Sequence, residues 1–308
     1  MNSISTRPLA PLPGGSDALG TPASRLKNST MLKQRVLTAL LLIPLVIGLI
    51  FYTSDRAFLI TLAVVFTLGG WEWAGISGLV ARPARLVYSL LILAVLAALA
   101  WALVQNAYQV MPGYLLGVLT FWLLATLWIL MFRGAQGPIT PWRRIRYLVS
   151  GLLVLSGPFL ALAVLHARPD DGPWHVLFVL ILIWVADSGA YFAGRAWGRR
   201  KLAPQVSPGK SWEGVLGGLA GVLVAGVIGG YLLGIQPGAL PLFVGISVAT
   251  ACFSILGDLF ESLVKRESGV KDSGHILPGH GGIMDRIDSL TSAAPVYLFL
   301  LWITGIPL

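Results

Sequence analysis

The sequence predicts an all-α integral membrane protein that crosses the bilayer about nine times. Three observations predict this class: 56% of the 308 residues are hydrophobic, only 11% are charged, and the mean hydropathy is +0.79. Soluble domains carry roughly 25% charged residues. The apolar residues also form long continuous runs, whereas a transmembrane barrel would show segments of about ten residues with alternating polarity. Soluble, disordered and barrel classes are therefore excluded.

A helix that crosses the hydrocarbon core needs about 20 mainly apolar residues. Stretches that meet this requirement lie near residues 36–53, 57–75, 86–105, 112–132, 147–166, 174–193, 212–235, 240–257 and 289–308. Residues 1–30 are rich in Pro, Gly, Ser and Thr, so we expect a disordered tail. We expect residues 31–170 to hold the first five helices. Residues 171–308 should hold the last four, together with the loops that carry the function.

The distribution of positive charge predicts the orientation of these helices, because cytoplasmic loops hold the excess of Lys and Arg. With the nine spans above, every Lys and Arg except Arg56 and Arg168 falls on the side of the N-terminus. The N-terminus is therefore expected in the cytoplasm and the C-terminus in the periplasm. The formal net charge of +9 follows from this topology and favours anionic lipid headgroups, so no nucleic-acid partner is expected.

Most carboxylates lie near the predicted cytoplasmic ends of the helices. These are Glu72, Asp187, Glu213, Asp258, Glu261, Glu267, Asp272, Asp285 and Asp288. Asp187 lies inside the sixth expected span, where a charge costs at least a few kcal/mol unless it faces a polar cavity or a partner. The alternative for Asp187 is a helix-packing role in which it bonds to neighbouring hydroxyls.

The loop between the sixth and seventh expected spans alternates cations and hydroxyls with Gly and Pro. The candidate anion-binding residues of this loop are Arg195, Lys201, Ser207, Lys210 and Ser211. Such a loop can present N–H, ammonium and guanidinium donors to a polyphosphate, and Ser211 opens a helix whose N-terminus favours anions. It is not a Walker loop, because Pro204 stands where that motif requires Gly. The alternative is an ordinary positively charged cytoplasmic loop.

The loop between the eighth and ninth expected spans is richest in polar residues. If the eighth helix continues beyond the membrane, Asp258, Glu261 and Lys265 share one face. Asp285 and Asp288 would share a face at the start of the ninth span. Oxygen donors without a Cys or His cluster suit Mg²⁺. Carboxylates for metal beside cations for phosphate are typical of phosphoryl or nucleotidyl transfer sites.

The residues of this last loop resemble a known family. Residues 262–288, SLVKRESGVKDSGHILPGHGGIMDRID, resemble the signature of the phosphatidate cytidylyltransferases. The resemblance extends upstream through DSGAY at 187–191, KLAP at 201–204 and SPGKSW at 207–212, so its specific part covers about residues 184–290. The earlier helices match only in general character, including the sequence WEW at 71–73. The resemblance implies CTP and phosphatidic acid as substrates, and CDP-diacylglycerol and pyrophosphate as products.

The resemblance also implies roles for individual residues. Mg²⁺ is expected to bind Asp258 and Asp285, with or without a second mono- or divalent cation. Asp187 is expected either to bind the metal directly or to contact one of its ligands. The triphosphate is expected on Arg195, Lys201, Ser207, Lys210 and Ser211. Four cations are expected to bind phosphate groups, some of them pyrophosphate and the others the lipid phosphate: Lys265, Arg266, Lys271 and Arg286. Asp288 would bind metal or orient Arg286, and His280 would assist proton handling or bond within its turn.

The resemblance further implies a homodimer in the bacterial inner membrane, with the site on the cytoplasmic face. Three other functions are open on sequence alone. A CTP transferase for another lipid phosphate, such as an isoprenoid-ether glycerol phosphate, would use the same polar residues. A transporter would commonly show repeated halves and charges near the bilayer midplane, whereas this sequence shows no repeat and its charges gather at the expected cytoplasmic helix ends. A scaffold protein would leave the charged loops without a purpose.

Overall fold

A computed structural model describes residues 42–105, 111–134, 137–274, 276 and 281–306. The chain divides into two units, 1–44 and 45–308. The second unit contains almost all of the described residues. The expected tail at 1–30 and the expected role of His280 lie outside the described residues.

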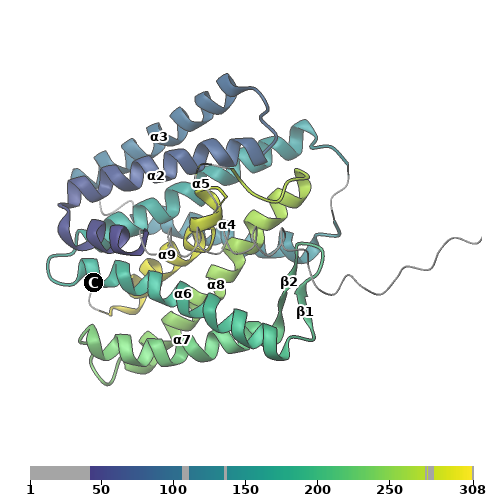
Figure 1. The fold of residues 1–308 in the computed structure, drawn as a ribbon. Helices are drawn as coiled ribbons and strands as arrows, with labels where there is room; N and C mark the ends of the chain where they lie inside the picture. Colours follow the sequence, from purple (N-terminus) through teal and green to yellow (C-terminus); the bar gives the residue numbers. More distant parts are fainter. Residues whose placement is uncertain (1–41, 106–110, 135–136, 275, 277–280, 307–308) are drawn as a thin grey trace, which may run out of the picture. The chain divides into compact units, whose positions relative to one another are not determined.

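The second unit is a bundle of long helices, shown in Figure 1. Eight described helices are long and apolar enough to cross a membrane, and a shorter apolar helix covers Leu42–Tyr52. The eight are α2 (Asp55–Ile76), α3 (Arg82–Val104), α4 (Met111–Met131), α5 (Pro141–His166), α6 (Gly172–Trp197), α7 (Trp212–Leu232), α8 (Leu240–Glu267) and α9 (Met284–Thr304). The protein is thus a polytopic all-α membrane protein, as predicted. The expected first span at 36–53 lies partly outside the described residues.

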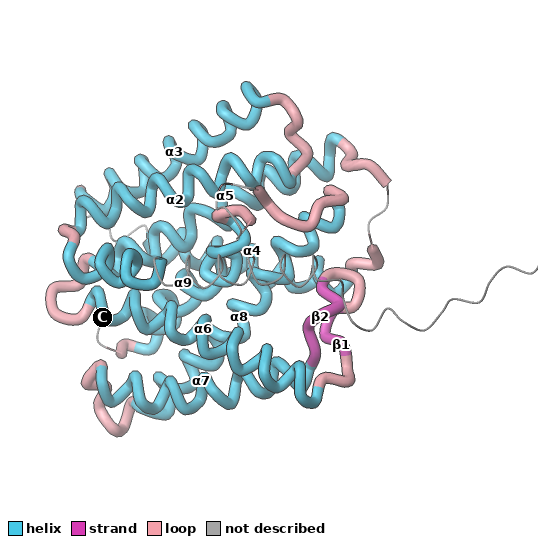
Figure 2. The backbone as a smooth tube through the Cα atoms, viewed as in Figure 1, coloured by secondary structure: helices cyan, strands magenta, loops and turns pink. Residues whose placement is uncertain are grey.

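The hairpin between α6 and α7, magenta in Figure 2, was not predicted. Strands β1 (Lys201–Ala203) and β2 (Ser207–Ser211) pair antiparallel, with Lys201 opposite Ser211. The Pro and Gly residues of this segment disfavour strands, which is why the sequence indicates a loop. The carboxylate of Glu213 offsets this low strand propensity, because it accepts hydrogen bonds from the backbone N–H groups of Arg199 (3.0 Å) and Arg200 (3.2 Å) just before β1.

Small residues allow α6 and α7 to pack closely. A Cβ added at Gly218 would lie 2.5 Å from the carbonyl oxygen of Ala186, and one added at Gly189 would lie 2.9 Å from Cα of Gly218. The two backbones therefore approach at a distance that only glycine permits at these points. This contact holds the hairpin, which joins the two helices, at a fixed place.

Contacts between loops bring several helix ends together. The hydroxyl of Ser268, after α8, donates to the carbonyl oxygen of Ile76 at the end of α2. Arg143 at the start of α5 pairs with Glu267 at 2.9 Å. The loops that follow α2, α4 and α8 therefore lie at one end of the bundle. These are loops that the charge distribution assigns to a single side of the membrane.

Candidate active site

The extension of α8 beyond the expected span forms one wall of the site. The helix is continuous from Leu240 to Glu267, so Asp258, Glu261 and Lys265 lie on successive turns of one face, as predicted. The hydroxyl of Ser262 donates to Oδ1 of Asp258 at 3.2 Å. The polar face of α8 thus extends from Asp258, next to the apolar part of the helix, to Lys265 near its C-terminal end.

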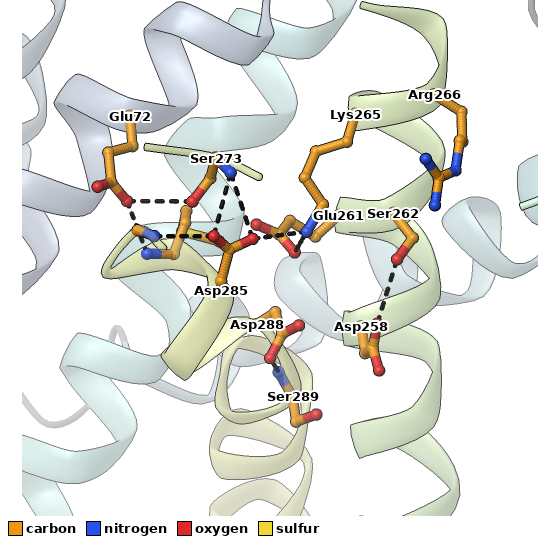
Figure 3. Close-up of polar contacts among 12 residues, drawn as sticks. Glu72, Asp258, Glu261, Ser262, Lys265, Arg266, Ser273, Asp285, Asp288 and Ser289 are labelled. Atoms are coloured by element: carbon orange, nitrogen blue, oxygen red, sulfur yellow. Dashed lines mark hydrogen bonds and ion pairs between the residues drawn. The ribbon is translucent and has the colours of Figure 1, made fainter. Parts of the chain in front are cut away.

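Lys265 joins two carboxylates at the centre of the site. Its Nζ lies 2.6 Å from Oε2 of Glu261 and 2.6 Å from Oδ1 of Asp285, and Figure 3 shows these contacts. The side chains are 11% exposed for Lys265, 1% for Glu261 and 11% for Asp285. Because they are shielded from water, the ion pairs are screened much less than surface pairs. The contacts fix α8 against the start of α9.

Asp285 is held in place by the loop that precedes it. Its Oδ2 accepts hydrogen bonds from the backbone N–H groups of Gly282 (2.8 Å) and Ser273 (3.1 Å). Asp285 lies in the first turn of α9, where a negative charge is favoured by the helix dipole. Both oxygens of this carboxylate are therefore oriented by specific donors.

The hairpin contributes Lys210 to the same site. Nζ of Lys210 lies 2.6 Å from Oδ2 of Asp258. The neighbouring Ser211 is buried and caps α7, because its Oγ accepts a hydrogen bond from the backbone N–H of Gly214 at 3.2 Å. The hairpin is also joined to α8 by Arg266, whose Nε donates to the carbonyl oxygen of Val206 at 3.2 Å.

Asp187 and Asp288 lie beside this cluster. Asp187 is within electrostatic range of Lys210 and Asp258. Asp288 is within range of Asp258, Glu261 and Lys265, and its Oδ1 accepts a hydrogen bond from the backbone N–H of Ser289 at 2.7 Å. The carboxylates of α6, α8 and α9 are therefore close enough to interact electrostatically.

The remaining expected site residues lie on the hairpin, on α6 and around the α8–α9 connection. Lys201, Lys271 and Arg286 are exposed, and Ser207 lies in β2 opposite Ala203. The guanidinium of Arg195 donates to the hydroxyl of Tyr191 at 3.0 Å. Their expected contacts with phosphate stay predictions.

The donor chemistry of the site fits a hard divalent cation. Among the described residues, no group of three or more His, Cys, Asp or Glu side chains is arranged to hold a metal ion. Asp258 and Asp285 each pair with a lysine ammonium, so both carboxylates accommodate positive charge. Oε1 of Glu261 is buried and has no hydrogen-bond partner within the described part of the chain. Mg²⁺ commonly binds through one or two carboxylates and substrate phosphates, which is compatible with this arrangement.

Glu72 is a part of the site to which the sequence assigned no role of its own. This α2 side chain is 2% exposed, and its Oε2 accepts hydrogen bonds from the backbone N–H of Met284 (2.8 Å) and the hydroxyl of Ser273 (3.2 Å). The sequence did contain one sign that Glu72 has a specific partner, namely its position inside the apolar span expected at 57–75. Such a residue is costly without a partner.

The fold and the site define a class: a polytopic membrane protein whose acidic and basic side chains converge where several helices end. This combination suits an enzyme that handles phosphate groups, because carboxylates can hold metal while cations and N–H groups stabilise anionic oxygens. The cytidylyltransferase family model matches residues 33–304. The chain therefore belongs to the cytidylyltransferase family and is a nucleotidyltransferase.

Named relatives agree with this assignment. A phosphatidate cytidylyltransferase of Pseudomonas aeruginosa is 43% identical over 276 residues, which cover 89% of this chain and 98% of the relative. One of Haemophilus influenzae is 41% identical over 288 residues, covering 87% and 98%. One of Brucella suis is 38% identical over 198 residues, covering 63% and 71%. These relatives confirm the family that the charged loops indicated. The similarity to the first two extends beyond those loops over most of the chain.

Proposed function

We propose that the protein transfers CMP from CTP to phosphatidic acid and releases pyrophosphate. A phosphate oxygen of the lipid attacks the α-phosphorus of CTP. The bond between that phosphorus and the oxygen bridging to the β-phosphate breaks, so CDP-diacylglycerol forms without a covalent enzyme intermediate. The observation that carries the proposal is the cluster of Asp258, Lys265, Asp285 and Lys210, which joins α8, α9 and the hairpin in a chain of this family.

The residues of the cluster have complementary roles in the proposal. Asp258 and Asp285 hold Mg²⁺, with or without a second cation and with Asp187 beside them, and the bound metal supplies charge neutralisation for the triphosphate. Lys210 leaves Asp258 to bind a phosphate oxygen of CTP, together with Lys201, Ser207, Ser211 and Arg195. Lys265 orients Asp285 and is also one of the four cations that bind pyrophosphate or the lipid phosphate, with Arg266, Lys271 and Arg286. Asp288 assists the metal site or orients Arg286, and His280 assists proton transfer or stabilises its turn.

The proposed location is the bacterial inner membrane, with the charged end of the helices in the cytoplasm. This orientation follows from the excess of Lys and Arg in the loops at that end. It lets the site meet a soluble nucleotide and a lipid headgroup at one surface. A homodimer remains part of the proposal and is tested by the mass of the protein in detergent.

The test is formation of labelled lipid from radiolabelled CTP by purified protein in detergent. Phosphatidic acid is supplied in one reaction and an isoprenoid-ether glycerol phosphate in another, each with and without EDTA. We expect product from phosphatidic acid that disappears with EDTA. Product only from the ether lipid would instead identify the second acceptor, and product that survives EDTA would contradict the metal assignment.

Variants at the two proposed metal ligands make the test specific to the site. Asp258→Ala and Asp285→Ala are expected to abolish turnover while the protein still inserts and purifies. Asp170→Ala is the matched control, because Asp170 is an exposed carboxylate in the loop between α5 and α6. Wild-type turnover in either site variant would contradict the assignment.

A further inference from the structure

Glu72 belongs to a part of the chain that carries none of the residues assigned to the reaction. It lies in α2, whereas the assigned residues lie in α6, α8, α9 and the segments between them. Even so, its carboxylate contacts Ser273, in the segment after α8, and Met284, the first residue of α9. Figure 3 shows Glu72 on the opposite side of this segment from Lys265.

The two partners of Glu72 are linked directly to Asp285. Ser273 donates its hydroxyl to Oε2 of Glu72 and its backbone N–H to Asp285. Met284, whose backbone N–H donates to the same Oε2, immediately precedes Asp285. One buried carboxylate oxygen therefore anchors both the residue before Asp285 and a residue that orients the Asp285 side chain.

Glycines on the segment make room for this carboxylate. A Cβ added at Gly274 would overlap Glu72, and the three nearest atoms to it would all belong to the Glu72 side chain. A Cβ added at Gly282 would overlap Oε2 of Glu72 and the hydroxyl of Ser273. The backbone at Gly274 and Gly282 therefore packs directly on the carboxylate, which leaves little freedom for these two residues to move while Glu72 is in place.

Two further contacts hold α2 against the same region. Ser268 donates its hydroxyl to the carbonyl oxygen of Ile76. A Cβ at Gly69 would lie 3.6 Å from Sδ of Met284 and 3.6 Å from Cδ1 of Ile287. α2 thus meets the start of α9 at Gly69, about one turn before Glu72. It meets the end of α8 at Ile76, about one turn after Glu72.

We propose that Glu72 is a positioning residue, which holds Ser273 and the start of α9 so that Asp285 faces Lys265 and the reacting phosphates. It acts through Ser273 and Met284 and does not touch substrate. This inference rests on the proposed function for the part that Asp285 plays. The geometric part, that Glu72 orders Ser273 and the start of α9 at Met284, can be tested without any turnover.

The first test compares Glu72→Ala with Glu72→Gln. The alanine variant leaves the buried N–H of Met284 without its acceptor, so we expect kcat to fall about tenfold or more while KM for CTP changes little. The glutamine variant keeps a carbonyl oxygen at the same place and is expected to recover most of the lost kcat. Equal loss in both variants, or wild-type kcat in the alanine variant, would overturn the proposal.

The second test measures hydrogen exchange of the purified protein without substrate. In Glu72→Ala we expect faster exchange in the peptides that contain Ser273 or Met284 and unchanged exchange in peptides of α6 and α7. Faster exchange throughout the helices would show a general loss of stability and overturn the positioning role. Because this readout needs no substrate, an inactive wild-type protein would contradict the proposed function while the test of Glu72 still stands.

A double-mutant comparison tests the packing directly. Gly274→Ala places a methyl group against Glu72, so we expect it to lower kcat, whereas Gly274→Ala in the Glu72→Ala background should cost little more than Glu72→Ala alone. Gly245→Ala is the matched control, because nothing lies within 4 Å of a Cβ at that position. Additive effects of the two substitutions would contradict direct contact between residues 72 and 274.

Discussion

Lys265 shows how a single buried cation holds this site together. Its ammonium group pairs with Glu261, which is almost wholly buried, and with Asp285, which is mostly buried. Removing one partner of a buried pair is strongly destabilising, since the remaining charge is left without compensation. Lys265 is therefore expected to matter for stability as well as for turnover.

Lys265→Met is predicted to destabilise the protein by about 3–5 kcal/mol, because two shielded carboxylates lose their cation. The measurement is thermal unfolding in detergent, followed by tryptophan fluorescence. Glu261→Gln in the Lys265→Met background removes one of the uncompensated charges and is expected to recover part of the loss. A double variant that is less stable than Lys265→Met would contradict this explanation.

Among the helices, the packing of α6 against α7 governs the geometry of the site. Gly218 lies where a methyl group would press on the carbonyl oxygen of Ala186, and the hairpin that carries Lys210 connects these two helices. A small displacement of either helix would therefore move Lys210 relative to Asp258.

Gly218→Ala is predicted to destabilise the protein by about 1–3 kcal/mol, because the backbones must separate to admit the methyl group. Gly245→Ala in α8 meets open space and should be neutral or stabilising by up to about 1 kcal/mol, from the higher helix propensity of alanine. Thermal unfolding in detergent compares the two. Equal destabilisation would show that the α6–α7 contact is looser than described.

Glu213 stabilises the hairpin by accepting hydrogen bonds from the backbone N–H groups of Arg199 and Arg200. Glu213→Ala is predicted to raise KM for CTP severalfold with little change in kcat, because the hairpin holds proposed triphosphate ligands but neither proposed metal ligand. Steady-state kinetics at saturating phosphatidic acid measures both constants. A fall in kcat with unchanged KM would place the effect elsewhere in the site.

These elements also show what the sequence could predict. Long apolar runs predicted the eight helices because span length is set by bilayer thickness. The shared face of Asp258, Glu261 and Lys265 was expected on the condition that the eighth helix continues beyond the membrane, and α8 meets this condition because it runs to Glu267. The hairpin was missed because its pairing depends on Glu213 and on the fixed ends of α6 and α7, which local strand propensity does not reveal.

Contacts distant in sequence were beyond this kind of prediction. Nothing in the spacing of Glu72 indicates that it meets Met284, because the two residues are brought together by the packing of α2 on the start of α9. The sequence likewise suggested Lys210 as a phosphate ligand but not its pairing with Asp258. The sequence predicted that most of the carboxylates lie on one side of the membrane. Only the structure identifies which cation pairs with which carboxylate.

For the molecule as a whole, the proposed orientation puts the charged end of the bundle in the cytoplasm. Single cysteines in a Cys252→Ala background test this orientation, because Cys252 is the one cysteine of the sequence and its removal leaves each introduced thiol alone. We predict that Arg199→Cys is labelled by an impermeant thiol reagent only in inverted vesicles and Asp170→Cys only in right-side-out vesicles. The opposite pattern would reverse the topology, and labelling of both from one side would contradict an odd number of spans between them.

The proposed reaction moves a nucleotidyl group to a lipid phosphate, so the fate of each phosphate of CTP distinguishes it from other phosphate chemistry. Purified protein is given phosphatidic acid with CTP labelled at the α-phosphate or, in a parallel reaction, at the γ-phosphate. We predict labelled lipid from α-labelled CTP only, with label from γ-labelled CTP recovered in pyrophosphate. Lipid labelled from the γ-phosphate would show phosphoryl transfer instead and would contradict the proposed reaction.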